Sequence, residues 1–321
     1  GLSIPLCYLG TMNRKRWLAL LLFVVVALLV VGLGRLIQSR ETGHPWREAT
    51  LYGRGEKVLL LEVVGSIPTG KDLENLLSKI RQAQEDQGIQ AVVLFVDSPG
   101  GSVTETEAIH RALKDLAREK PLVAAFGTVA ASGGYYVATA AREIFTPATA
   151  ITGSIGVIAT LPQVQGLLAK LGVQVEVLKE GRLKDMGSGL RPLTPEERTL
   201  IQGYMREAYE LFVDRVAEGR RLPEDKVRQL ADGRIYSGPQ AIALGLADRE
   251  GYLEDAAKRA AELAGLEEFR LVRYVKPKGL LDGLLGEGFP LGLSSETEQL
   301  VSLLGQNRFR LEYRYLGGGL W

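Results

Sequence analysis

The chain has 321 residues, a formal net charge of +1 and 46% hydrophobic residues, a composition typical of a globular protein with an apolar core. Its basic residues form no stripe along the sequence, so we expect no nucleic-acid partner. Cys7 is the single cysteine and lies near the N-terminus, which leaves the rest of the chain without a disulfide or a cysteine nucleophile.

An apolar run without a charged or polar side chain occupies residues 17–34, directly after residues 14–16 (Arg-Lys-Arg). At 1.5 Å per residue the run spans about 27 Å, close to the thickness of the hydrocarbon core of a bilayer. We therefore expect residues 1–16 to form a cytoplasmic tail and residues 17–37 to form one transmembrane anchor. Arginines also follow the run, so the charge difference across it is small. A short N-terminal tail before a large domain nevertheless favours a tail in the cytoplasm and a domain outside it. Residues 32–34 (Gly-Leu-Gly) imitate a signal-peptide cleavage site, so removal of the segment remains an alternative.

The rest of the chain alternates between buried-strand and amphipathic-helix patterns, which predicts an α/β fold. Residues 38–57 are polar and are predicted to form a linker before a main domain over residues 58–275. Strands are expected over residues 58–64, 91–96, 122–126, 143–145 and 173–178. Helices are expected over residues 72–84, 103–119, 135–141, 194–220, 224–230 and 253–264, the fourth opening with the capping pattern Thr-Pro-Glu-Glu.

The last part of the chain, residues 276–321, is rich in glycine and leucine and is predicted to lack a core of its own. Within it, residues 309–316 alternate well enough to form a strand. We interpret this tail as a candidate oligomerisation arm.

Residues 131–136 (Ala-Ser-Gly-Gly-Tyr-Tyr) place Ser132 where a predicted strand ends and a helix begins. The free N–H groups at a helix start, and its positive dipole end, suit the negative charge that develops on an attacked carbonyl. Ser132 is therefore a candidate nucleophile. The alternative is that its hydroxyl only caps the helix.

A serine nucleophile needs a base, and the two histidines, His44 and His110, are both interpreted as surface residues. A serine-histidine-aspartate triad would need His110 in an unusual chain order. Lys184, within residues 181–188 (Gly-Arg-Leu-Lys-Asp-Met-Gly-Ser), is a candidate base, since burial among apolar groups favours the neutral amine. The alternative is an ordinary loop lysine.

Residues 97–101 (Asp-Ser-Pro-Gly-Gly) follow a predicted buried strand and precede a helix. Their glycines offer backbone N–H groups that suit an oxyanion hole. An ordinary strand-to-helix turn uses the same residue types, so this motif is weak when taken alone.

Taken together and in this order, these motifs and residues 153–157 (Gly-Ser-Ile-Gly-Val) resemble the signal peptide peptidase A family. Its members are membrane-anchored serine proteases of the Clp protease/crotonase superfamily. The resemblance covers residues 57–275 and includes residues 236–238 (Tyr-Ser-Gly) and 245–248 (Gly-Leu-Ala-Asp).

The resemblance implies a Clp protease/crotonase-like fold of repeated β-β-α units and a catalytic dyad of Ser132, the nucleophile, and Lys184, the general base. It also implies an oxyanion hole formed by the N–H groups of Gly101 and Gly133, and a role for Ser154 in orienting the lysine. No metal or cofactor is implied. The chain departs from the family pattern at Leu183 and at residues 189–190, which leaves the shape of that loop and the substrate preference open.

By the same resemblance, the substrates are signal peptides left in the membrane after secretion, bound as extended apolar segments. The protein is expected in the cell membrane, held in lipid by its anchor, with an extracytoplasmic catalytic domain and a ring-like homo-oligomeric assembly. Three alternatives stay open: a related membrane Ser-Lys protease acting on membrane proteins, a crotonase-like enzyme that stabilises an enolate, and a membrane scaffold without catalysis.

Overall fold

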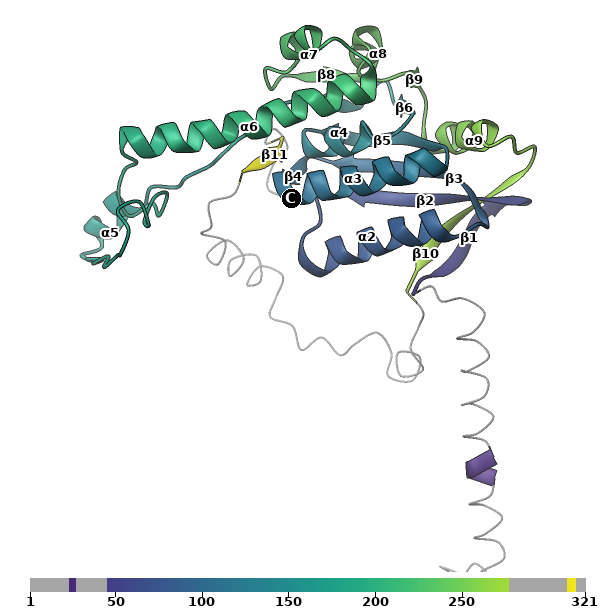
Figure 1. Ribbon diagram of the computed structural model, residues 1–321, viewed down its shortest axis with the longest axis horizontal. Helices are drawn as coiled ribbons and strands as arrows, with labels where there is room; N and C mark the ends of the chain where they lie inside the picture. The colour runs from purple at the N-terminus through teal and green to yellow at the C-terminus, as the bar shows by residue number, and fades with distance from the viewer. Residues whose placement is uncertain (1–22, 27–44, 277–310, 316–321) are drawn as a thin grey trace, which may run out of the picture. The chain divides into compact units, whose positions relative to one another are not determined.

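A computed structural model describes residues 23–26, 45–276 and 311–315 (Figure 1). The chain divides into two compact units, Gly1–Pro45 and Trp46–Trp321. The predicted tail with Cys7, His44 and most of the predicted anchor lie outside the described residues, although residues 23–26 are helical. Within the described ranges, no helix combines the length and the hydropathy that a membrane span requires.

The second unit is built on a nine-stranded mixed sheet whose main path runs β1-β10-β2-β3-β5-β6-β9. All neighbours from β10 to β9 are parallel, whereas β1 is antiparallel to β10. These strands are β1 (Arg47–Gly53), β2 (Glu56–Val64), β3 (Ile89–Ser98), β5 (Leu122–Ala131), β6 (Glu143–Thr146), β9 (Arg249–Glu250) and β10 (Phe269–Val275). A side branch adds β7 (Ile151–Gly153), parallel to β5, and β8 (Ile235–Ser237), antiparallel to β7. A parallel-rich sheet of this kind is consistent with the predicted Clp protease-like fold.

Two short strands, β4 (Gly100–Ser102) and β11 (Glu312–Arg314), form a separate antiparallel pair. The described part of the C-terminal tail thus packs against the loop that follows β3. The helices are α2 (Gly70–Glu85), α3 (Val103–Glu119), α4 (Gly133–Ala138), α5 (Gln165–Lys170), α6 (Pro195–Arg220), α7 (Glu224–Leu230), α8 (Gly238–Leu244) and α9 (Leu253–Leu263).

Successive side chains of the central strands point to opposite faces of the sheet, and both faces are buried. One core contains Leu59, Leu61 and Leu94 together with apolar residues of α2, α3, α4 and α6. The other contains Leu60 and Val93, which pack against four alanines of α9. Burial on both faces explains why β2, β3 and β5 have nearly continuous apolar sequences.

Most predicted elements are confirmed, with ends that differ by a few residues. The long helix α6 begins as predicted: Thr194 Oγ1 accepts from the Glu197 N–H at 3.2 Å, and the Glu197 carboxylate accepts from the Thr194 N–H at 2.9 Å. The strand predicted over residues 173–178 is wrong. That segment pairs with no strand in the described structure, and Val173, Val175 and Val177 are each exposed by more than two fifths.

Candidate active site

Ser132 occupies a strained turn between β5 and α4. Its backbone has φ 54° and ψ −119°, a region that non-glycine residues rarely adopt and that costs about 1–3 kcal/mol. Two hydrogen bonds hold the turn: the Ser132 N–H donates to the Gly153 carbonyl, and the Tyr136 N–H donates to the Ser132 carbonyl, each at 2.8 Å. A serine held in a strained strand-to-helix turn is the arrangement in which α/β hydrolases present their nucleophile.

The alternative role of Ser132 as a helix cap is not supported by its contacts. Its side chain makes no capping hydrogen bond to α4. By contrast, Thr194 and Ser237 cap α6 and α8 with extended backbones and side chains that accept from the third helical N–H. The Ser132 hydroxyl is therefore not used to satisfy the helix start.

Ser154 lies beside Ser132 because of the register between β5 and β7. Ala131 pairs with Gly153 in this parallel ladder, so each serine directly follows a paired residue. Ser154 also has a positive φ, 49°, and its N–H donates to the Arg234 carbonyl at 2.8 Å. Both serines line one pocket, so the structure brings these two predicted residues together.

The two glycine turns predicted to form an oxyanion hole are in contact. A β-carbon added at Gly133 would lie 3.1 Å from the Gly100 Cα, and one added at Gly100 would lie 2.6 Å from the Gly133 nitrogen. Gly100 also has a φ of 98°, which favours glycine. Gly101 is the middle residue of β4, and Gly133 is the first residue of α4. Gly133 directly follows Ser132, and Gly101 directly follows Gly100, which contacts Gly133.

Lys184 is not brought to Ser132 within this chain. Its side chain is exposed, its N–H donates to the Gly181 carbonyl at 3.0 Å, and it does not line the pocket that contains the two serines. The segment around Lys184 is instead attached to the N-terminal end of α6 by a pair of hydrogen bonds, at 2.5 and 2.6 Å, from Arg182 to Glu196.

A second ion-pair group fixes the same segment. Arg191 contacts Asp185 at 2.6 Å and Glu197 at 2.5 Å, and the Glu197 side chain is only 1% exposed. The Arg191 guanidinium and the N–H of Thr194 hold the pKa of Glu197 at about 2, so this carboxylate stays charged at neutral pH. The cluster orders the loop that carries Lys184.

Tyr209, farther along α6, lines the pocket of Ser132, whereas Glu196 anchors the Lys184 segment. At 1.5 Å per residue, these two positions of α6 lie about 20 Å apart. Figure 1 shows the result: α6 runs past the edge of the sheet, and the segment with α5 lies beyond its N-terminal end.

His110 is buried, contrary to its prediction as a surface residue. Its side chain is 3% exposed and packs edge-on against Tyr136 with ring centroids 5.2 Å apart. Burial lowers the pKa of His110 to about 4, so the ring is neutral at pH 7. The periodicity of α3 gave no sign of this contact, because the covering residues come from α4 and α6.

Several pocket residues had no sequence signal at all. Besides the serines, the pocket is lined by Tyr209, Arg228, Asp232, Arg314 and Tyr315, which come from distant parts of the chain. Among the residues that the structure describes, no group of three or more His, Cys, Asp or Glu side chains is arranged to hold a metal ion.

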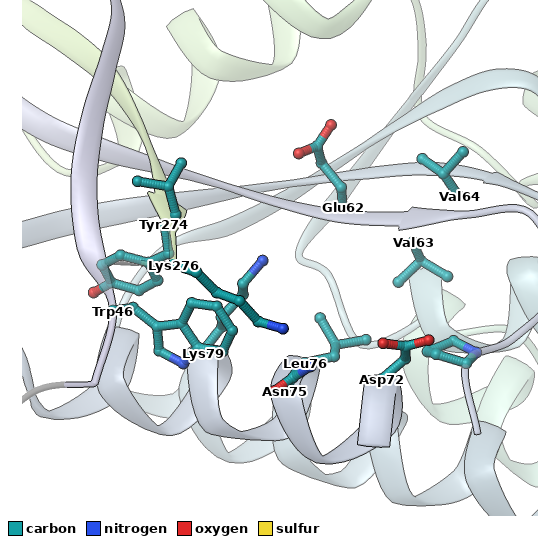
Figure 2. A pocket seen from close by; sticks show the side chains of 12 residues that line it. Trp46, Glu62, Val63, Val64, Asp72, Asn75, Leu76, Lys79, Tyr274 and Lys276 are labelled. Atoms are coloured by element: carbon teal, nitrogen blue, oxygen red, sulfur yellow. The ribbon is translucent and has the colours of Figure 1, made fainter. Parts of the chain in front are cut away.

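A second hollow lies between β2, α2 and the end of β10 (Figure 2). Trp46, Lys79, Tyr274 and Lys276 line one end of it, with the Lys79 ammonium 4.7 Å from the centre of the Trp46 ring. None of the predicted site residues lines this hollow.

Comparison with known proteins agrees with the geometry. Residues 114–267 match the model of peptidase family S49, and residues 61–153 match the Clp protease model. The chain is 38% identical to a putative protease of Synechocystis, over 83% of this chain and 95% of the relative. It is 35% identical to a putative signal peptide peptidase SppA of Enterococcus faecium, over 82% of this chain and 85% of the relative.

A third relative is the chloroplastic serine protease SPPA of Arabidopsis thaliana, which is 34% identical. The match covers 73% of this chain and 37% of that longer protein. The strained serine turn, the paired glycine loops and these matches lead to one assignment. The chain belongs to peptidase family S49 and is a serine peptidase.

Proposed function

We propose that the protein is a membrane-anchored endopeptidase in which Ser132 is the nucleophile and Lys184 is the general base. The observation that carries this proposal is the strained turn at Ser132, which leaves a hydroxyl free of capping bonds beside two glycine N–H groups. Such donors stabilise the oxyanion of acyl transfer, and removal of one donor costs about 10²–10³ in kcat.

In the proposed reaction, neutral Lys184 accepts the Ser132 proton while the serine oxygen attacks the carbonyl carbon of a peptide bond. The N–H groups of Gly101 and Gly133 bind the oxyanion, and the amine product leaves with the proton. Water then hydrolyses the ester and restores the serine. Ser154 lines the same pocket as Ser132, and in this proposal it hydrogen-bonds the incoming lysine amine.

The base comes from a neighbouring subunit in this proposal, because Lys184 is attached to the end of α6 remote from its own Ser132. The surface around it favours association. Apolar side chains that are 42–88% exposed gather on the 167–178 segment and α6: Leu167, Leu171, Val173, Val175, Val177, Leu178, Leu200 and Tyr204. Monomeric proteins rarely expose apolar patches of this kind, and a closed ring of identical subunits would cover each one.

We assign the substrates as signal peptides left in the membrane after secretion, with membrane proteins as the alternative class. The apolar run at residues 17–34 supports an anchor, and the name of the Enterococcus relative supports the substrate class. An anchored enzyme meets membrane-embedded peptides at a high local concentration. The catalytic domain is proposed to lie outside the cytoplasm.

The catalytic proposal is tested with a fluorophosphonate probe and a synthetic signal peptide. We expect the wild type to be labelled and to cleave the peptide, and Ser132→Ala to lose both. Lys184→Ala should also lose cleavage. Ser78→Ala and Lys258→Ala are the controls, because the Ser78 hydroxyl accepts from the Trp46 indole, Lys258 is exposed on α9, and neither residue lines the serine pocket. Full activity in folded Ser132→Ala would reject the proposal.

The proposed location is tested by adding a protease to intact spheroplasts. The loops of residues 58–275 should be cut without lysis. Digestion that requires lysis would place the active site in the cytoplasm, whatever the fate of the catalytic residues.

A further inference from the structure

Tyr136, Glu107 and Arg215 form a hydrogen-bonded cluster that joins α4, α3 and α6. The Tyr136 hydroxyl donates to the Glu107 carboxylate at 2.6 Å, and Arg215 Nη2 donates to the other oxygen of the same carboxylate at 2.8 Å. Tyr136 is fully buried, and its ring packs against His110 and Phe212 with centroids 5.2 and 4.9 Å away. Glu107 is 29 positions from Tyr136 and 108 from Arg215, so no sequence motif predicted the cluster.

The protonation states of the cluster make both hydrogen bonds strong. Burial and the bond to Glu107 raise the pKa of Tyr136, so its hydroxyl keeps its proton and acts as the donor. Burial also raises the pKa of Glu107, but the bonds from Arg215 and Tyr136 more than offset this effect and hold that pKa below its ordinary value. The carboxylate is therefore charged at neutral pH, and hydrogen bonds to a charged group are roughly twice as strong as those between neutral groups.

Tyr136 is attached to the turn that carries Ser132. Its backbone N–H donates to the Ser132 carbonyl at 2.8 Å, while its hydroxyl reaches Glu107 on α3. Helix α4 begins at Gly133, directly after Ser132, and α3 begins two residues after Gly101. The hydrogen bond between Tyr136 and Glu107 therefore links the helix that begins with one predicted oxyanion donor to the helix that begins just after the other.

The glycine turns limit how closely these two helices approach each other. A β-carbon added at Gly133 would lie 2.9 Å from Thr106 Oγ1 of α3 and 3.1 Å from the Gly100 Cα, so the two helix starts are in contact. A van der Waals contact between two atoms attracts by only about 0.1–0.2 kcal/mol, so these contacts hardly oppose separation. The charge-assisted hydrogen bond from Tyr136 to Glu107 opposes it.

We infer that Tyr136 and Glu107 are positioning residues, which act on the reaction by fixing the separation of the two predicted oxyanion N–H groups. This inference rests on the proposed roles of Ser132, Gly101 and Gly133. Oxyanion donors must lie about 2.7–3.1 Å from the oxygen that they stabilise, and a displacement of about 1 Å can lower the rate about 100-fold.

Tyr136→Phe tests the inference, because it removes one hydroxyl and keeps the ring that packs against His110 and Phe212. We expect kcat for a synthetic signal peptide to fall by roughly tenfold while KM stays within about twofold, since the peptide is still bound but its oxyanion is stabilised less. A peptide aldehyde, whose adduct with Ser132 places an oxygen at the same donors, should bind about tenfold more weakly.

Tyr135→Phe is the matched control. Tyr135 is the neighbouring residue of α4, is equally buried, and donates its hydroxyl to the Leu246 carbonyl at 2.8 Å, so both variants lose one buried hydrogen bond from the same helix. We expect Tyr135→Phe to lose stability in urea titrations and to keep its kcat. Equal losses of kcat in the two variants would overturn the inference, as would a rise in KM with an unchanged kcat in Tyr136→Phe.

Glu107→Gln tests the other end of the bond. Its amide oxygen still accepts from the Tyr136 hydroxyl but carries no charge, so we expect a smaller loss of kcat, about threefold. The double variant should be as slow as Tyr136→Phe within about twofold, since both changes act on one hydrogen bond. Losses that multiply in the double variant would show that the two residues act separately and would refute the inference.

Arg215→Gln decides the question if Tyr136→Phe does not fold. Its matched control is Arg259→Gln, because Arg259 of α9 contacts Glu143 of β6 at 2.7 Å in an ion pair of similar length and burial. We expect only Arg215→Gln to lower kcat, and equal kcat values would overturn the inference. A wild type that cleaves no peptide and binds no fluorophosphonate would instead refute the proposed function itself.

Discussion

Mixing two inactive variants tests whether each active site is shared between subunits. Ser132→Ala keeps Lys184, and Lys184→Ala keeps Ser132, so neither variant alone has a complete dyad. Their recombination restores activity only if the lysine of one chain acts on the serine of another. The segment that carries Lys184 is attached to α6 at Glu196, whereas Tyr209, about 20 Å along the helix, lines the serine pocket.

The magnitude follows from counting subunits in a closed ring. In an equal, random mixture, half of the subunits keep the serine and half of their neighbours keep the lysine. About one quarter of the sites are then complete, so we expect about 25% of wild-type activity. A dyad within one chain predicts none. A general base must come within about 3 Å of the serine hydroxyl, far less than the span of α6 between those two positions.

The assay is hydrolysis of a quenched signal peptide by co-expressed variants that carry different tags and are purified through both. A mixture of Ser132→Ala with Lys258→Ala is the matched control, since its second partner keeps the whole dyad; about half of its sites should be active. If doubly tagged assemblies have no activity while the control mixture is active, the lysine does not act between subunits.

Three further predictions concern groups around the site. His110 has a pKa of about 4 against an ordinary value of 6.5, so the unfolded chain binds a proton first and stability falls from pH 6.5 towards 4. The loss should be on the order of 3 kcal/mol in urea titrations and should shrink in His110→Phe. Gly134→Ala would place a β-carbon 2.4 Å from the Ser98 carbonyl oxygen, so we expect a loss of about 1–3 kcal/mol in unfolding free energy together with reduced activity. Gly203→Ala, which meets no atom within 4 Å, should leave both intact. Arg191→Ala should lower kcat by roughly tenfold with an unchanged circular dichroism spectrum, because the loop that carries Lys184 loses its ion pairs.

Local patterns predicted the elements whose partners lie inside the domain. The apolar runs of β3 and β5 and the spacing along α3 reflect burial on both faces of the sheet. The capping pattern at Thr194 also predicted the start of α6 to the residue. Apolar runs, helical spacing and capping patterns depend on residues close together in the sequence, so they predict these elements without knowledge of the topology.

The predictions from the sequence failed where the contacting residues are distant in the chain. The alternating valines of residues 173–178 suggested a strand, yet the segment is exposed and pairs with no described strand. An apolar alternation predicts that one face of a segment is covered, but nothing in the described part of this chain covers these valines. For His110 the error was the opposite: the residue was predicted to be exposed and is buried, since α4 and α6 cover a face of α3 whose own sequence is polar. Likewise, nothing local to Tyr313 revealed that it faces Gly101, more than 200 positions away.

The backbone angles of the two serines also bear on two alternatives that the sequence left open, a scaffold without catalysis and a crotonase-like enzyme. Ser132 and Ser154 both have positive φ angles, and each such residue costs about 1–3 kcal/mol. A scaffold that used Ser132 only to start a helix would be more stable with the extended capping geometry of Thr194 and Ser237, which the same chain adopts twice. A crotonase-like enzyme needs the glycine N–H groups but no serine at this turn. The strain at Ser132 agrees with the proposed acyl transfer, in which the serine hydroxyl would react in front of the Gly101 and Gly133 amides.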